Sequence, residues 1–381
     1  MIQTSSQPTL RVAALGDIML DREVGKRYFA APRDFQLSEL ADYLSRYDLV
    51  IANLENPVGL RGNPHPKQDP HVAFRCHPDT LQVLNNLNVD VVTLANNHLL
   101  DYGAETLADT LDHLDNAGIK HLGAGRNYEE ANRPVIVNVG GGTVAIVATV
   151  MIYSASTERA SGNRPGVADF NIKRLLKQIR ALKGQGHAVI ATIHWGIEYC
   201  LYPIPYQRQQ AKAMIDAGAS LIVGHGPHFP QGIEPYKHGQ IVHSLGNFIF
   251  DEPYPNSKRS FIYGADINSS GVIVGHQVLP TFCKHCIPEV DPRLDASRTV
   301  VVANQFHKLY DRKDKRFWKS INGKWLSDIV WRVTFMKSLK FLRLPPLGFY
   351  FSIGFGSLLK KFSLKNIVWA FRLLFKQIAR Q

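Results

Sequence analysis

The chain has 381 residues, of which 45% are hydrophobic and 20% are charged, an ordinary globular composition. Its net charge of +12 is uneven, because residues 308–381 hold 17 Lys and Arg against three acids and the rest of the chain carries −2. Four cysteines exclude a disulfide scaffold in a chain of this length. No apolar run reaches the roughly 20 residues of a spanning helix, and Met1 to Thr9 does not form a secretory signal. We therefore expect a cytoplasmic protein.

Strand-like apolar runs alternate with amphipathic helical stretches from Leu10 to about Phe250, which predicts an α/β fold. Helices are expected over residues 37–43, 78–86, 103–117, 170–183 and 206–217. The strands are continuous runs of Val, Ile, Leu and Ala, typical of sheets that are covered on both faces. Residues 135–139 and 143–149, joined by three glycines, predict a hairpin.

Five of the predicted strands end abruptly in side chains of the kind that bind metals. The endings are Gly16-Asp17, Asn53-Leu54-Glu55, Asn96-Asn97-His98, His194-Trp195-Gly196 and Gly224-His225-Gly226-Pro227-His228. In α/β folds ligands bind beyond the carboxyl ends of strands, so we expect the five endings to converge on one crevice. Asp, Glu, Asn and His supply the oxygen and nitrogen donors that divalent ions prefer. The pattern predicts a metal centre.

Two of these endings offer more than ligation, and each has an ordinary structural alternative. Glu55 could bridge two ions, or it could be a loop carboxylate. Asn97 could fill a site already rich in anions while His98 protonates a leaving oxygen, or the pair could cap a helix.

The other endings also have alternatives. Asp17 is of a type that often serves as a helix cap or turn residue. A lone histidine such as His194 is more often a satisfied core residue. His225 and His228 flank a Gly-Pro turn, which would hold two imidazoles as a fixed chelating pair.

Beyond residue 251 the sequence changes character. Residues 252–317 predict a strand and loop extension that packs on the core, and residues 318–381 predict a basic, aromatic, amphipathic helical tail. The tail fits an anionic membrane interface, or a helical cap on the core with a solvated basic face; nucleic acid fits less well because large apolar residues interrupt the basic ones. Cys283-Lys284-His285-Cys286 could belong to a zinc site, although an ordinary loop is favoured.

Taken together, seven segments resemble the CapA family of bacterial capsule synthesis and poly-γ-glutamate biosynthesis proteins, over residues 10–251. The segments are residues 16–20, 53–57, 94–98, 101–103, 194–199, 224–228 and 236–250. The resemblance implies a four-layer α-β-β-α sandwich of the calcineurin-like metallophosphatase type, with a metal site at the strand ends. This sequence departs from the phosphoesterase pattern at Met19, where a phosphoesterase usually has His. It departs from the CapA pattern at Gly226, where CapA-type sequences commonly have His.

The resemblance also implies roles for individual residues. His98 would be the catalytic histidine, and the metal ligands would be Asp17, Glu55, Asn97, His194, His225 and His228. Residues expected to bind substrate or to support the ligands are Asn53, Asn96, Glu198 and Asn247. The cofactor would be one or two divalent metal ions, of Mn, Fe, Zn or Mg, and the departures at Met19 and Gly226 allow a mononuclear centre.

The implied function is that of a metal-dependent hydrolase with a phosphoesterase-like site, acting in capsule or poly-γ-glutamate-type polymer synthesis. The alternative is a non-catalytic accessory protein that binds an acidic polymer in a membrane-associated complex. Expected partners are the synthesis machinery, an acidic polymer or phosphorylated substrate, and the inner face of the cell membrane through the tail.

Overall fold

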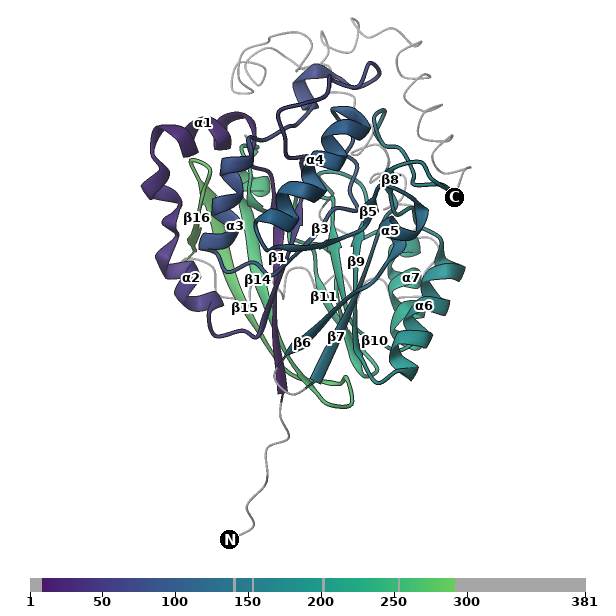
Figure 1. Cartoon of the computed structure of the whole chain (residues 1–381). Helices are drawn as coiled ribbons and strands as arrows, with labels where there is room; N and C mark the ends of the chain where they lie inside the picture. Colours follow the sequence, from purple (N-terminus) through teal and green to yellow (C-terminus); the bar gives the residue numbers. More distant parts are fainter. Residues whose placement is uncertain (1–8, 140–141, 153, 201–202, 253, 292–381) are drawn as a thin grey trace, which may run out of the picture. The chain divides into compact units, whose positions relative to one another are not determined.

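Two β-sheets and a small two-stranded ribbon make up the strands of this computed structural model (Figure 1). The structure describes residues 9–139, 142–152, 154–200, 203–252 and 254–291. All of them belong to a unit that spans Met1–Leu309. The predicted tail, residues 318–381, lies outside the described residues.

The first sheet is parallel at its centre. Its spatial order is β16 (Ile287–Val290), β15 (Ile273–Lys284), β14 (Arg259–Asn268), β1 (Thr9–Ile18), β2 (Leu49–Leu54), β3 (Val91–Thr93) and β4 (Lys120–Leu122), with β13 (Asn247–Ile249) also paired to β1. Strands β1 to β4 run parallel, so their carboxyl ends meet at one edge. The register places Asp17 opposite both Asn53 and Asn247.

The second sheet is parallel except at its two edge strands. Its order is β11 (Ile233–Tyr236), β12 (Gly239–Val242), β10 (Ala219–His225), β9 (Ala188–His194), β7 (Gly142–Val150) and β6 (Val135–Val139). The predicted hairpin is confirmed as β6 and β7, which pair antiparallel. His194 and His225 are register partners at the ends of β9 and β10. The ribbon pairs β5 (Ala124–Gly125) with β8 (Gly166–Val167).

The helices occur where the apolar periodicity predicted them, with two additions. The predicted ones are α2 (Ser38–Leu44), α3 (Gln82–Asn86), α4 (Gly103–Asn116), α6 (Ile172–Gly184) and α7 (Pro205–Asp216), and α3 is preceded by a 3-10 turn, η3 (Pro78–Leu81). The additions are α1 (Arg22–Ala30) and α5 (Tyr128–Asn132). Short 3-10 turns complete the set: η1 (Pro32–Gln36), η2 (Pro70–Val72) and η4 (Pro255–Lys258). Helix α1 buries only Val24, and four of its nine residues are charged.

Alternating side chains of each central strand enter different hydrophobic cores. In β1, Ala13 and Leu15 pack toward α1 to α4, whereas Val12 and Ala14 pack between the two sheets. A third core lies between the second sheet and helices α6 and α7. Three cores separate four layers, helix, sheet, sheet and helix (Figure 1), so the predicted α-β-β-α sandwich is confirmed.

Strands β14 to β16 extend the first sheet beyond residue 251. β14, which lies within the predicted strand and loop extension, pairs antiparallel with β1 from Thr9 to Ala14. The division of the chain at residues 251 and 317 stays a prediction. Among the helices that the structure describes, none is long and apolar enough to cross a lipid bilayer.

Cys283 and Cys286 lie at the turn of the β15–β16 hairpin. Both thiols are buried, and burial raises the pKa of Cys283 to about 12 and that of Cys286 to about 11. Neither belongs to a group of three or more potential metal ligands within the described part of the chain. Cys283 is a strand residue of β15, so the segment is not an open loop, and the zinc alternative stays a prediction.

Candidate metal centre

The ends of β1 and β2 bring two carboxylates together in the interior. Asp17 and Glu55 are both completely buried. The backbone N–H of Glu55 donates to Ile18 O at 2.8 Å, which keeps the chain beside β1 after β2 has ended. Between the carboxylates, Asn53 Nδ2 donates to Asp17 Oδ1 at 2.9 Å and to Glu55 Oε2 at 3.3 Å. Asn53 therefore orients both acids.

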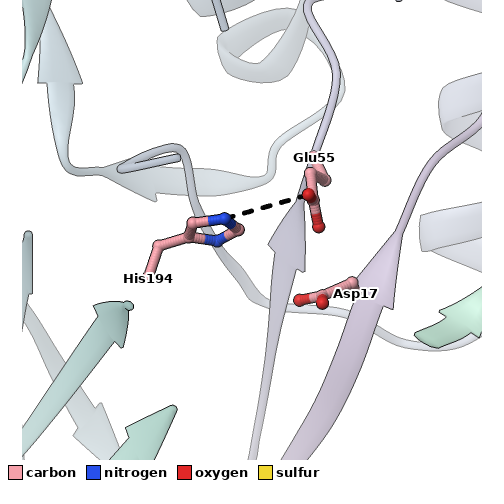
Figure 2. Close-up of side chains that lie close together, drawn as sticks. All are labelled: Asp17, Glu55 and His194. Carbon is pink, nitrogen blue, oxygen red and sulfur yellow. Dashed lines mark ion pairs between the residues drawn. The ribbon is translucent and has the colours of Figure 1, made fainter. Parts of the chain in front are cut away.

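The ends of β9 and β10 supply histidines from the other sheet. His225 Nδ1 donates to Asp17 Oδ1 at 2.8 Å, so its Nε2 carries the lone pair. His194 comes from the opposite side of the site and points toward Glu55, with 3.8 Å between Nε2 and Glu55 Oε1 (Figure 2). One donor atom each from Asp17, Glu55 and His194 lies within 4.8 Å of the others. This spacing suits a shared cation.

His228 reaches the same carboxylates after a sharp turn of the backbone. The turn uses Gly226, whose φ of +104° favours glycine, and a Cβ there would lie 2.8 Å from Trp195 O. His228 Nδ1 donates to Asn247 Oδ1 at 2.8 Å, and its Nε2 lies 3.7 Å from Glu55 Oε1. Asn247 thus supports His228, and Gly226 has no room for a side chain.

The two buried carboxylates have opposite protonation tendencies. Burial and the Asp17 charge raise the pKa of Glu55 well above its usual value. Burial would also raise the pKa of Asp17, but the hydrogen bond that His225 donates holds that pKa below its usual range. Burial lowers the pKa of His194 to about 3, so its imidazole is neutral and can donate a lone pair. Positive charge between the two carboxylates would favour the ionised form of both.

Five buried side-chain atoms of this region that could bind a metal have no hydrogen-bond partner among the described residues. They are Asp17 Oδ2, Glu55 Oε1, Asn97 Oδ1, His194 Nδ1 and His225 Nε2. Leaving such atoms unpaired in the interior costs about 1–3 kcal/mol each. The five comprise two carboxylate oxygens, an amide oxygen and two imidazole nitrogens, which are groups that bind divalent cations, whereas the nearby unpartnered Asn247 Nδ2 is an N–H donor. The residues present therefore fit a divalent cation.

His98 lies next to Asn97 and is held by neighbours of its own. Its ring stacks on Phe74 with centroids 4.3 Å apart, and its Nδ1 donates to Asp101 Oδ2 at 2.8 Å. Its backbone N–H donates to Asn96 Oδ1, while Asn96 Nδ2 donates to Asn53 Oδ1 at 3.3 Å. Hydrogen bonds through Asn96 and Asn53 therefore connect the loop that carries His98, the His98 loop, to the carboxylates of Asp17 and Glu55.

Asp101 received no role in the sequence analysis, although it follows His98 by three residues in a tight turn. That spacing is the one signal that could have found it. Glu198 follows β9, and its charge contributes to the raised pKa of Glu55, as does that of Glu252. Met19 is completely buried, and its sulfur accepts the backbone N–H of Asp21 at 3.1 Å.

The fold and the donor set define an α/β sandwich protein with a candidate metal centre between its sheets. Residues 11–252 match the protein family described as bacterial capsule synthesis protein PGA_cap, and the chain belongs to that family. It is 33% identical over 327 residues to the capsule biosynthesis protein CapA of Bacillus anthracis, covering 83% of this chain and 78% of the relative.

A second relative and one solved structure also resemble this chain. The PGA biosynthesis protein CapA of Bacillus subtilis is 30% identical over 330 residues, which cover 86% of this chain and 84% of the relative. The crystal structure of a 5'-nucleotidase precursor from Thermus thermophilus aligns with a TM-score of 0.44 at 15% identity, covering 79% of this chain and 59% of that one.

Proposed function

We propose that the chain is a metal-dependent hydrolase with a phosphoesterase-like site, acting on a phosphorylated substrate in capsule or poly-γ-glutamate-type polymer synthesis. The observation that carries the proposal is the set of five unpartnered, buried oxygen and nitrogen atoms that segments of both sheets bring to one place. Folded proteins pair most of their buried polar atoms, so this gathering of unpaired atoms supports a bound ion.

The proposed ligands are Asp17, Glu55, Asn97, His194, His225 and His228. When bound, a divalent ion of Mn, Fe, Zn or Mg supplies Lewis acidity that neutralises developing charge on phosphoryl oxygens. The protein's own residues do the orienting. Asn53 fixes the planes of both carboxylates, and Asn247 fixes the tautomer of His228 so that its Nε2 faces Glu55.

His98 is the proposed proton donor to the leaving oxygen. Because Nδ1–H is committed to Asp101, only Nε2 is available to hold a transferable proton. The Asp101 carboxylate stabilises the charged imidazole before transfer and fixes its orientation. Stacking on Phe74 restricts rotation of the ring.

The biological setting rests on the relatives. Those of Bacillus anthracis and Bacillus subtilis are named for capsule and PGA biosynthesis, which supports a role for this chain beside polymer synthesis machinery. Residence at the inner face of the cell membrane, through residues 318–381, belongs to the same proposal.

The test is turnover of bis(p-nitrophenyl) phosphate by full-length protein that has been stripped with EDTA and refilled with Mn²⁺. We expect metal-dependent hydrolysis that falls by about 10²–10⁴-fold in His98→Ala. His121→Ala is the matched control and should keep the activity, because His121 lies on β4 and pairs with Asp115 of α4.

Hydrolysis that is equal in wild type and His98→Ala would overturn the catalytic proposal. Metal binding without any turnover, combined with binding of poly-γ-glutamate, would instead establish the accessory alternative. Metal content at background level would exclude the proposed centre itself.

A further inference from the structure

Three hydroxyl groups from the segment after β7 lie against the loop that carries Asn97, His98 and Asp101. This hydroxyl cluster consists of Ser154, Ser156 and Thr157. Ser154 Oγ and Thr157 Oγ1 donate to the backbone oxygen of Asn97 at 2.7 and 3.0 Å. β7 belongs to the second sheet, whereas the His98 loop follows β3 of the first. The cluster therefore joins the two halves of the site.

Ser156 makes the contact that bears on His98. Its hydroxyl donates to Asp101 Oδ1 at 2.6 Å, and both residues are completely buried. Ser154 Oγ lies 2.9 Å from Ser156 Oγ, close enough to donate to it in place of the Asn97 oxygen. A buried serine with these contacts has a defined orientation.

Asp101 accepts four hydrogen bonds, two on each oxygen. Oδ1 accepts from Ser156 and from Gln68 Nε2 at 2.9 Å, while Oδ2 accepts from Phe74 N–H at 2.9 Å and from His98 Nδ1. The donors on Oδ1 oppose rotation of the carboxylate about its Cβ–Cγ bond. Rotation of the carboxylate would break the hydrogen bond between Asp101 Oδ2 and His98 Nδ1. The donors on Oδ1 therefore help to hold the imidazole in position. The Ser156 bond is the shortest of the four.

We propose that Ser156 is a positioning residue that acts on His98 through Asp101. The inference rests on the proposed function for its kinetic consequence, but its structural consequence can be measured without turnover. Loss of the hydroxyl leaves Asp101 Oδ1 with one donor, weakens the hold on the carboxylate, and broadens the set of His98 orientations. Supporting partners of this kind typically change activity by 10–100-fold.

The kinetic test compares two phosphodiesters in the Mn²⁺-loaded full-length protein. Bis(p-nitrophenyl) phosphate releases a group that needs little protonation, whereas diphenyl phosphate releases one that needs more. In Ser156→Ala we expect kcat for diphenyl phosphate to fall about tenfold. The kcat for bis(p-nitrophenyl) phosphate should fall less, and KM should stay unchanged for both substrates. Ser156→Cys keeps the size but not the strong donor, and should behave like Ser156→Ala.

Ala155→Ser is the matched control, because it changes an exposed neighbour in the same segment. Equal losses for both substrates, or a change confined to KM, would overturn the inference and indicate a general structural role. Unchanged kcat for diphenyl phosphate in both Ser156 variants would overturn it as well.

A second readout separates this inference from the proposed function. In protein with ¹⁵N-labelled histidine, His98 should show a hydrogen-bonded Nδ1–H and ring proton signals shifted by the stacked Phe74 ring. The His98→Ala variant assigns these signals. Ser156→Ala should move or broaden these signals even if the wild type hydrolyses nothing. An unchanged His98 spectrum would overturn the role of Ser156, whereas absent turnover with a changed spectrum would overturn only the proposed function.

Discussion

His225 Nδ1 donates a 2.8 Å hydrogen bond to Asp17 Oδ1, although 208 positions separate the two residues and their strands belong to different sheets. Both side chains are buried, with 1% and 0% exposure. The bond fixes the tautomer of His225 and leaves Nε2 as a lone-pair donor. Assembly of the centre therefore depends on the packing of one sheet on the other.

Divalent metal should stabilise the full-length protein. Binding to the folded state alone adds about 2.7 kcal/mol at a metal concentration 100-fold above Kd. We expect Tm to rise when Mn²⁺ is added to EDTA-treated protein, and to rise less in His225→Ala, which lacks one donor. Calorimetric scans with identical Tm values in EDTA and in Mn²⁺ would contradict the centre.

The raised pKa of Glu55 should make metal-free protein less stable as the pH increases. The folded state keeps a proton that the unfolded chain releases above pH about 4.5, so stability falls with pH by up to about 1.4 kcal/mol per unit until the folded pKa is reached. The lowered pKa of His194 works in the opposite direction, but its effect is complete above pH 6.5.

Glu55→Gln cannot titrate, so its stability should depend less on pH than that of the wild type. Urea unfolding in EDTA between pH 6.5 and 8 measures the difference. Parallel pH dependences for the two proteins in that window would show that Glu55 is ionised in the metal-free fold.

Asp101→Asn should lower turnover without removing the metal. The neutral amide still fills the site between Phe74 and Ser156, but it cannot balance a charged His98 imidazole. We expect kcat to fall by about 10–100-fold while the Mn²⁺-induced rise in Tm is kept. Loss of that rise would mean that Asp101 supports the ligands and not His98.

Arg22 offers a test of backbone strain near the site. Its guanidinium pairs with Asp251 and lies 4.6 Å from the centre of the Phe74 ring, and its φ of +51° is unfavourable for any residue with a Cβ. Arg22→Ala and Arg22→Gly remove the same contacts, but only glycine relieves the strain. The loss of unfolding free energy should be about 1 kcal/mol smaller for Arg22→Gly. Equal losses would show that the strain contributes nothing.

Gly16 permits the close approach of the chain before β13. A Cβ at this position would lie 2.2 Å from Gly246 O, a backbone atom that cannot move alone. Gly16→Ala should therefore lower the free energy of unfolding by about 1–3 kcal/mol. Gly184→Ala is the control, since nothing lies within 4 Å of its Cβ, and it should be neutral or stabilising.

Much of the fold was predictable because local patterns determine its elements. The continuous apolar runs of β1, β2, β9 and β10 indicated buried parallel strands, and the polar residues after them indicated where each strand ends. Helix α1 was missed because it is short and four of its nine residues are charged. The pairing of β14 with β1 was not predicted, because the two strands lie about 250 residues apart in the sequence.

The sequence by itself determined the strand ends, the residue types placed there and the family that they resemble, since these depend on local order along the chain. Only the tertiary structure decided which atoms face each other: His225 with Asp17, His228 with Asn247, and Ser156 with Asp101. The physical reason is that each pair joins segments that are distant in sequence or belong to different sheets. Their contact depends on strand register and sheet packing, which no local pattern encodes.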